Sequence, residues 1–180
     1  MAGKMAGKID ERGYMNAMNK KGFNSSRALS ELYANALDAG AKKIVAKIVD
    51  KFIWIIDDGQ GMDISGHENL WDAQRENHSD DNSTGVSGFG AKPSTKQLSK
   101  NTTVSYYSKT KDGNYCKSVT PWGKMVSEGK YTGMIKITEM NSDEIDKFVK
   151  LCHGKSGTII QFEYNYFIRD EILKQFNDPM

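Results

Sequence analysis

Residues 44–62 read IVAKIVDKFIWIIDDGQGM. Two β-rich runs, Ile44 to Val49 and Phe52 to Ile56, are separated by only two residues, which predicts an antiparallel hairpin. The second run ends in Asp57, which is followed by two glycines one residue apart. A carboxylate at the end of a buried strand is costly unless it accepts hydrogen bonds, and the exocyclic amine of a purine is one suitable donor. A plain strand-to-turn exit is the alternative interpretation, since Asp-Gly is common in turns.

An amphipathic helix is predicted immediately before this hairpin. Ser25 and Ser26 are suitable residues to cap its start, and Gly40 is suitable to end it. The apolar residues of the segment recur at three- and four-residue spacing: Ala28, Leu29, Leu32, Ala36 and Leu37.

One side of the predicted helix carries polar residues that suit phosphate chemistry. Glu31, Asn35 and Asp38 are four and three residues apart, so they project from the same side. The side-chain oxygen of Asn suits Mg²⁺, a hard cation that keeps most of its waters and bridges to phosphates. A glutamate one turn earlier could accept a proton from an attacking water. An ordinary polar helix face is the alternative.

The segment after the hairpin differs sharply in composition. Residues 57–90 are rich in glycine and acids, which predicts a long polar loop. Beyond it we predict strands at 102–108, 115–120, 134–139 and 158–164, and helices at 93–99, 143–152 and 168–176. Ser142 is suited to cap the helix at 143–152. This order lacks the strict alternation of a doubly wound parallel sheet. We therefore expect an α+β fold, a two-layer α/β sandwich with a mixed, mainly antiparallel sheet and helices on one face.

A second glycine cluster, Gly85-Val86-Ser87-Gly88-Phe89-Gly90-Ala91-Lys92, follows the polar loop. Its G-x-x-G-x-G spacing is the reverse of the dinucleotide fingerprint, and Ala91 and Pro93 interrupt the phosphate-loop pattern. A glycine-rich loop that leads into a short helix still offers backbone N–H groups to an anion. A plain surface loop is the alternative.

Composition excludes several classes of protein. The chain has 180 residues, a net charge of +2, 38% hydrophobic and 10% aromatic residues, which suits one folded domain and not a disordered chain. Cys116 and Cys152 form no disulfide framework, and no apolar run approaches the ~20 residues that span a bilayer. We expect an intracellular protein, cytoplasmic or nuclear, with no membrane contact.

Residues 1–24 are expected to be a flexible leader or arm, and residues 25–180 the domain.

The charges divide along the chain. Residues 60–84 contain six acids and one base, whereas residues 85–130 contain eight lysines and two acids. Solvated surface explains either block alone, but a lysine-rich block that opens after a glycine cluster suits a site for phosphates. The phosphates of DNA would suit the block from Lys92 to Lys130 equally well.

Four short motifs occur in order: Glu31-x-x-x-Asn35-x-x-Asp38-Ala39, Asp57-x-Gly59-x-Gly61-Met62, Gly85-x-x-Gly88-x-Gly90 and Gly157-Thr158-Ile159-Ile160. Together they resemble the nucleotide-binding boxes of the GHKL superfamily. Its members are DNA gyrase B-type topoisomerases, ATP-dependent heat-shock chaperones, sensor histidine kinases, MutL mismatch-repair proteins and Microrchidia chromatin ATPases. The resemblance spans roughly residues 25–164 and implies the Bergerat-type sandwich of that superfamily.

The resemblance implies roles for the residues around the base of ATP. Asp57 would accept a hydrogen bond from the adenine amino group, and Thr158 and an ordered water would complete the contact. The adenine pocket would be shaped by Gly59, Gly61 and Met62.

It also implies roles at the phosphates. Asn35 would hold Mg²⁺ against the triphosphate, Glu31 would activate the attacking water, and Asp38 would help to order the water network of the pocket. A mobile ATP lid at about 63–92 would wrap the phosphates with Gly85, Gly88, Gly90 and Lys92.

Glu31 bears on the reaction, because the resemblance places it where the ATP-hydrolysing branches carry a general base and histidine kinases usually do not. The segment 92–109 looks more like Microrchidia or chaperone sequences than bacterial gyrase. We therefore expect a Mg-dependent ATPase, slow as an isolated domain, whose lid closure is coupled to an ATP-dependent homodimer and to remodelling of a DNA or protein client. Two alternatives stay open: a nucleotide-gated binding module without useful turnover, and a phosphotransfer domain of the histidine- or serine-kinase type.

Overall fold

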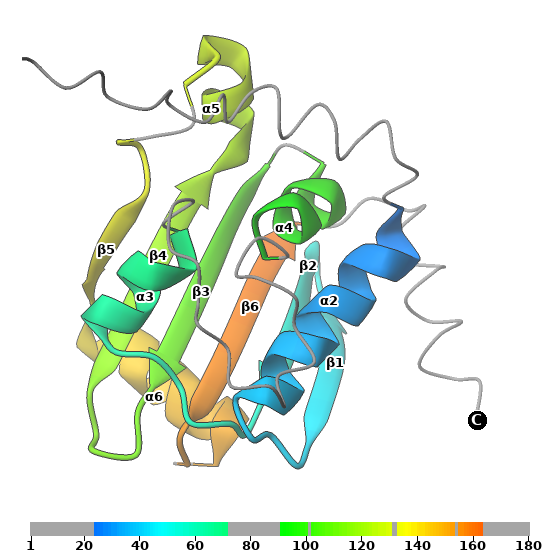
Figure 1. The fold of residues 1–180 in the computed structure, drawn as a ribbon. Coiled ribbons are helices and arrows are strands. Elements are labelled where there is room, and N and C mark those ends of the chain that lie inside the picture. Colours follow the sequence, from blue (N-terminus) through cyan, green and yellow to red (C-terminus); the bar gives the residue numbers. More distant parts are fainter. Residues whose placement is uncertain (1–23, 72–90, 101, 131–132, 154, 164–180) are drawn as a thin grey trace, which may run out of the picture.

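The computed structural model describes residues 24–71, 91–100, 102–130, 133–153 and 155–163 (Figure 1). Six strands form one sheet in the order β1-β2-β6-β3-β4-β5, and each neighbouring pair is antiparallel. The strands are β1 (Ile44–Val49), β2 (Phe52–Asp57), β3 (Thr103–Lys109), β4 (Tyr115–Pro121), β5 (Lys136–Glu139) and β6 (Gly157–Glu163). The helices in these residues are α2 (Ser25–Asp38), α3 (Ile64–Trp71), α4 (Ala91–Ser99), α5 (Trp122–Glu128) and α6 (Ser142–Cys152). The predicted α+β class is confirmed.

Strand β2 lies inside the sheet and is buried on both faces. It pairs with β1 in the predicted hairpin and with β6 on its other side. Ile53 and Ile55 belong to one hydrophobic cluster, whereas Trp54 and Ile56 belong to a second cluster on the opposite face. A run that is apolar at every position suits a strand covered on both sides, and this explains why the late strand β6 inserts next to it.

One face of the sheet is covered by α2, α3 and α4, and α2 lies across β1 and β2 (Figure 1). The helix α2 forms where the sequence predicts it, but its N-cap is Asn24 and not Ser25 or Ser26, so it begins one or two residues earlier than expected. The Oδ1 atom of Asn24 accepts a hydrogen bond from the backbone N–H of Arg27 at 2.9 Å. The helix buries Ala28, Leu29 and Leu32 against the sheet, as its periodicity predicts. Leu37, which the same periodicity places on the apolar side, is 58% exposed.

Helix α6 departs from the expectation that the helices share one face, because it packs on the opposite side of the sheet (Figure 1). Phe148 and Cys152 from α6 join the cluster of Trp54, Ile56 and Ile159. The amphipathic pattern of α6 predicts that it is buried on one side, but it does not say which face of the sheet it covers.

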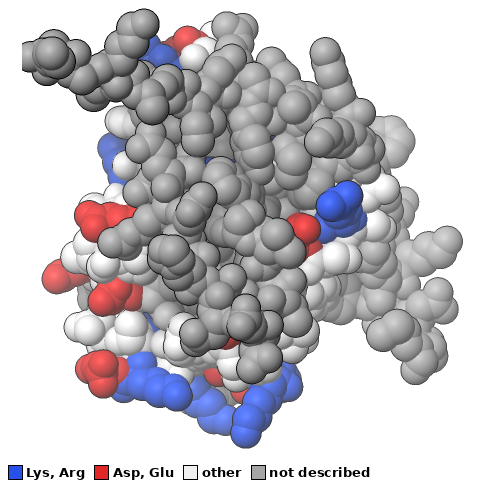
Figure 2. All heavy atoms as spheres, in the orientation of Figure 1, with Lys and Arg blue, Asp and Glu red and all other residues white. Residues whose placement is uncertain are grey.

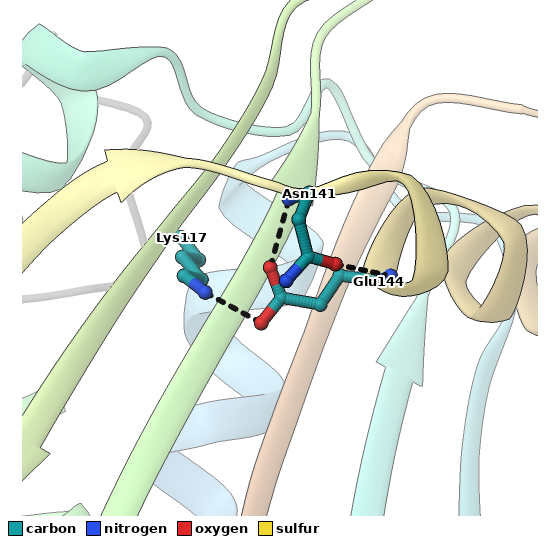
Figure 3. A network of polar contacts seen from close by, with 3 residues as sticks. All are labelled: Lys117, Asn141 and Glu144. Atoms are coloured by element: carbon teal, nitrogen blue, oxygen red, sulfur yellow. Dashed lines mark hydrogen bonds and ion pairs between the residues drawn. The ribbon is translucent and has the colours of Figure 1, made fainter.

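The start of α6 is tied to the sheet by a polar network (Figure 3). Asn141, rather than the predicted Ser142, is the N-cap: its side chain accepts from the N–H of Glu144, and the Glu144 carboxylate accepts from the N–H of Asn141, each at 3.0 Å. This reciprocal capping box satisfies two backbone donors. The same carboxylate pairs with the ammonium of Lys117 on β4, so the helix start is fixed to the far half of the sheet.

Two helices were not predicted. Helix α3 lies in the expected polar loop, and the Oδ1 atom of Asp63 accepts from the N–H of Gly66 at 2.7 Å where the helix starts. Helix α5 follows Pro121 and ends at Gly129, whose φ is 64°. Proline before a helix and glycine after it are helix signals that could have indicated α5. The predicted helix at 168–176 lies outside the described residues.

In the described parts of the chain, no helix has both the length and the apolar character that crossing a membrane requires.

Replacing Phe148 with Ala tests how firmly α6 holds the second cluster. Phe148 is 1% exposed, so its truncation should lower the free energy of unfolding by about 3–5 kcal/mol. The neighbouring Val149 is 37% exposed, and its replacement by Ala should change stability by less than about 0.5 kcal/mol. Urea unfolding of both variants measures the difference; equal losses would contradict the packing of α6 described above.

Candidate functional site

Asp57, the last residue of β2, carries a buried carboxylate. Its residue is 7% exposed, and its Oδ1 accepts a hydrogen bond from the N–H of Gly59 at 2.9 Å. Burial raises the pKa of Asp57 to about 6; hydrogen bonds from the backbone of Gly59 and Thr158 oppose this rise, and the charge of Asp58 adds to it. A buried acid with a raised pKa is typical of a binding or catalytic site.

A row of polar side chains crosses the sheet at the level of Asp57. Asp57 lies opposite Thr158 on β6, and Thr158 lies opposite Ser108 on β3. Because side chains alternate between the faces of a strand, all three share the face that is covered by α2 and α3. The hydroxyl of Ser108 donates to Oγ1 of Thr158 at 3.2 Å, and both residues are buried. The structure therefore brings Asp57 and Thr158 together, as the sequence predicts.

The loop after Asp57 is fastened to the end of α2. The N–H of Gln60 donates to the carbonyl of Ala39 at 2.9 Å. The carboxylate of Asp58 accepts from the N–H groups of Lys42 and Lys43, each at 2.8 Å, and these contacts lower the pKa of Asp58. The last turn of α2 is thus held beside the carboxylate of Asp57.

Glycine is required at three points around this loop. A Cβ at Gly59 would lie 2.9 Å from Oδ1 of Asp57 and 3.0 Å from the carbonyl oxygen of Ala39. Gly61 has a φ of 70°, and a Cβ there would overlap the carbonyl of Lys109. Gly157 has a φ of 149°, and a Cβ there would overlap the carbonyl of Asp57. These glycines let β2, β3 and the start of β6 approach one another closely.

The polar side of α2 differs in exposure along its length. Glu31 is half-buried, whereas Asn35 and Asp38 are exposed. Asp38 takes part in a polar interaction. The C-terminal end of α2 contacts the loop at Gly59. Since the three predicted residues share one side of α2, they form a line along the helix that begins near Asp57 and runs away from it.

Met62 is half-buried and packs against the first hydrophobic cluster, at the start of the segment that becomes α3. Gly66 allows α3 to approach it, because a Cβ at Gly66 would lie 2.9 Å from Cβ of Met62. The structure therefore places Met62 between the loop after β2 and the helix that follows.

Helix α3 is anchored on β4 by buried polar groups. Nδ1 of His67 lies 3.0 Å from Oγ of Ser118, and the indole N–H of Trp71 donates to the same oxygen at 2.9 Å. Burial lowers the pKa of His67 to about 4, so its imidazole is neutral at neutral pH. The ring of Trp71 also meets Tyr106 edge-on, with centroids 5.6 Å apart. The first part of the expected lid, 64–71, is therefore a packed helix.

The predicted phosphate residues are only partly within the described chain. Gly85, Gly88 and Gly90 lie outside it. Lys92 is half-buried at the second position of α4 and takes part in a polar interaction. Since α4 packs beside α2, Lys92 belongs to the helix next to the one that carries Asn35.

The surface next to α3 carries acidic side chains. Asp63, Glu68 and Glu139 are the charged residues among those that line a groove of about 630 Å³ next to α3, and Figure 2 shows acidic side chains gathered on that side of the molecule. Such a groove disfavours phosphates. The predicted lysine block is also divided, because Lys117 lies on the opposite face in its pair with Glu144.

Two features of the site were not predicted as functional. Ser108 was expected only as part of a strand, although the alternation of Val104, Tyr106 and Ser108 indicates that all three point to one face. Gly157 was recognised as part of a motif, but its contact with the carbonyl of Asp57 depends on the pairing of β2 with β6.

Replacing Asp57 with Asn tests whether the carboxylate is buried as a charge. The folded state binds this proton more tightly than the unfolded chain, because its pKa is about 6 instead of 3.8. The Asp57 titration therefore contributes a loss of stability of about 3 kcal/mol as the pH rises from about 4 through 6, and the comparison with the variant isolates this contribution. Asn keeps an acceptor for Gly59 and does not titrate, so the variant should be more stable than wild type at pH 7, with a smaller difference at pH 4. Urea unfolding at several pH values measures this; equal stabilities at pH 7 would contradict it.

Replacing Gly61 with Ala tests the close approach of the loop to β3. The variant should lose about 3 kcal/mol or more, because strain at positive φ adds to overlap with the carbonyl of Lys109. Gly113 has a φ of 92° but open space around its Cβ position, so its replacement by Ala should cost only about 1–2 kcal/mol. Thermal and urea unfolding compare the two. A loss at Gly61 no greater than that at Gly113 would mean that the overlap is relieved at no cost.

Comparison with known proteins extends the resemblance found in the sequence. A family model described as "Histidine kinase-, DNA gyrase B-, and HSP90-like ATPase" matches residues 23–158. The match covers more than half of the chain and runs from the start of α2 to Thr158, so it includes both residues of the buried polar pair. A search of curated proteins finds no match. The chain belongs to the histidine kinase-, DNA gyrase B- and HSP90-like ATPase family, the GHKL superfamily.

Proposed function

We propose that this chain binds ATP with Mg²⁺ and hydrolyses it at the site formed by α2, the end of β2 and the start of β6. Membership of an ATPase family implies a nucleotide site. The observation that carries the proposal is the buried carboxylate of Asp57 beside Thr158, because it is an unusual place for a charge in a structural sheet.

The base of ATP would bind at this pair. Adenine presents an amino group, which donates, next to the ring nitrogen N1, which accepts. A carboxylate only accepts, so Asp57 suits the amino group, and the Thr158 hydroxyl can donate to N1 directly or through one water. Gly59 and Gly61, which bear no side chain, and Met62 would form the walls against the ring.

The triphosphate would extend along the polar side of α2. The exposed amide of Asn35 offers the hard oxygen that Mg²⁺ prefers, and this ion takes few protein ligands when phosphates supply the others. Bound Mg²⁺ would neutralise charge on the phosphates. Asp38 would order the waters between Asn35 and the base. The donor set of α2 therefore fits the metal nucleotide.

Glu31 would act as the general base. It lies one helical turn before Asn35 on the same side of α2 and is half-buried. A carboxylate there can accept a proton from a water that attacks the terminal phosphate, provided that the metal nucleotide is held at Asn35. Its role differs from that of Asp57, which binds the base and moves no proton.

The lid would close over the phosphates and connect the site to a partner. Gly85, Gly88, Gly90 and Lys92 would wrap the triphosphate between α3 and α4. Because α4 packs beside α2, closure would shift a helix that contacts the catalytic one. We extend the proposal to a homodimer that forms with ATP bound and acts on a DNA or protein client, with residues 1–24 as an N-terminal arm.

Replacing Glu31 with Ala or Gln tests hydrolysis separately from binding. Both variants should bind a non-hydrolysable ATP analogue within about threefold of wild type, and their single-turnover rate should fall by about 10²–10⁴. Glu128→Ala, on the distant α5, is the matched control and should behave as wild type. Unchanged hydrolysis in the Glu31 variants would remove this residue from its role.

The Asp57→Asn variant tests the adenine assignment by calorimetry with the same analogue. Binding should be lost although the variant is folded, since the amide presents a donor where the amino group needs an acceptor. Normal affinity would make the assignment wrong.

ATP labelled at its terminal phosphate provides a further test, because hydrolysis releases the label as phosphate whereas a phosphotransfer domain passes it to a protein acceptor.

A further inference from the structure

The hydroxyl of Ser108 forms a buried hydrogen bond that indicates a role beyond packing. Ser108 is 0% exposed on β3, directly opposite Thr158. Its Oγ donates to Oγ1 of Thr158 at 3.2 Å. Thr158 in turn lies opposite Asp57, so three adjacent strands contribute one polar residue each to a continuous row.

The direction of this hydrogen bond matters. A hydroxyl has one hydrogen to donate and two lone pairs to accept with. Ser108 is fully buried, and Thr158 is the partner found for its hydroxyl within the described ranges, so the hydrogen of Ser108 is satisfied when it points at Oγ1 of Thr158. Thr158 then uses a lone pair for Ser108, and its own hydrogen is left for an acceptor that no described residue supplies. A hydroxyl that accepts a hydrogen bond also becomes a better donor, because successive hydrogen bonds polarise one another.

The pair at the end of the row therefore has a fixed polarity. Asp57 can only accept, and Thr158, supplied with a hydrogen bond by Ser108, is set to donate. Adenine has the matching pattern, an amino donor beside the N1 acceptor. Guanine and hypoxanthine present the reverse pattern, an oxygen acceptor beside an N1–H donor, which would face like groups on both residues.

We propose that Ser108 is a positioning residue for base recognition, which holds the Thr158 hydroxyl as a donor to N1 of adenine. The proposal rests on the proposed function, since it concerns the same site. Ser108 acts through Thr158 and touches no substrate. Its burial fits this role, because a buried hydroxyl that makes no hydrogen bond lowers the stability of the fold.

The experiment compares ATP with 1-deaza-ATP, in which a C–H group replaces N1 and the amino group is kept. Dissociation constants for both are measured by calorimetry without hydrolysis for wild type, Ser108→Ala, Thr158→Val and the double variant. Wild type should prefer ATP by about fivefold. Either single variant should lower this preference to about twofold or less, mainly through weaker binding of ATP.

The double variant separates positioning from general damage to the pocket. If Ser108 acts through Thr158, adding Ser108→Ala to Thr158→Val should not lower the preference further. Thr120→Ala is the matched control: Thr120 is 0% exposed on β4 and its hydroxyl has no hydrogen-bond partner, so its loss should leave the preference at the wild-type value. Ser108→Cys keeps a side chain of similar size with a much weaker hydrogen-bond donor, and it replaces Ser108→Ala if that variant does not fold.

The outcomes are distinct. A wild-type preference for ATP that persists in the Ser108 variants overturns the role of Ser108 and leaves ATP binding intact. A further fall in the double variant, or a fall in Thr120→Ala, assigns the effect to disturbed packing and also overturns it. Wild-type protein that binds neither nucleotide refutes the proposed function itself.

Discussion

The carboxylate of Asp57 lies at the end of an apolar strand, and each segment around it is shaped by the need to replace the water it has lost. The N–H of Gly59 solvates one oxygen, and a side chain at Gly59 would lie against that oxygen. The loop can reach back only because it is fastened to Ala39 and Lys42 after α2. Asp58, whose carboxylate accepts from the N–H of Lys42, and the apolar residues of α2 thus hold the end of this helix beside Asp57.

The two faces of the sheet carry different kinds of residue. The face under α2 and α3 carries the row of Asp57, Thr158 and Ser108, whereas the other face is filled by apolar residues under α6. The capping box and the pair of Lys117 with Glu144 hold the start of α6 on this second face, away from the polar row. These contacts fix α6 on one face of the strands, and the other face of the same strands carries the three polar residues.

The parts of the fold with a clear period were predictable. Helix α2 and the hairpin of β1 and β2 follow from the spacing of their apolar residues. Helix α3 was missed because its polar composition hides two buried residues, His67 and Trp71, which are four apart. The N-caps were displaced by one residue at Asn24 and Asn141 because neighbouring serines have the same capacity.

The candidate site was predictable to the extent that short motifs carry it. Asp57 and Thr158 were paired through resemblance alone, and the register of β2 with β6 brings them together. Ser108 could not be linked to Thr158, because that link needs the pairing of two strands about 50 residues apart in the chain. The requirement for Gly157 has the same origin, since the carbonyl it must avoid belongs to another strand.

The face that buries Asp57 also buries His67, and the two groups exchange protons with solvent in opposite senses. Between about pH 4 and 6 the folded chain keeps a proton on Asp57 that the unfolded chain releases. Over the same range it lacks a proton on His67 that the unfolded chain takes up. Stability rises with pH where the unfolded state binds more protons and falls where the folded state does. The two contributions therefore oppose each other in mild acid, so neither titration alone sets how the stability of the domain changes with pH.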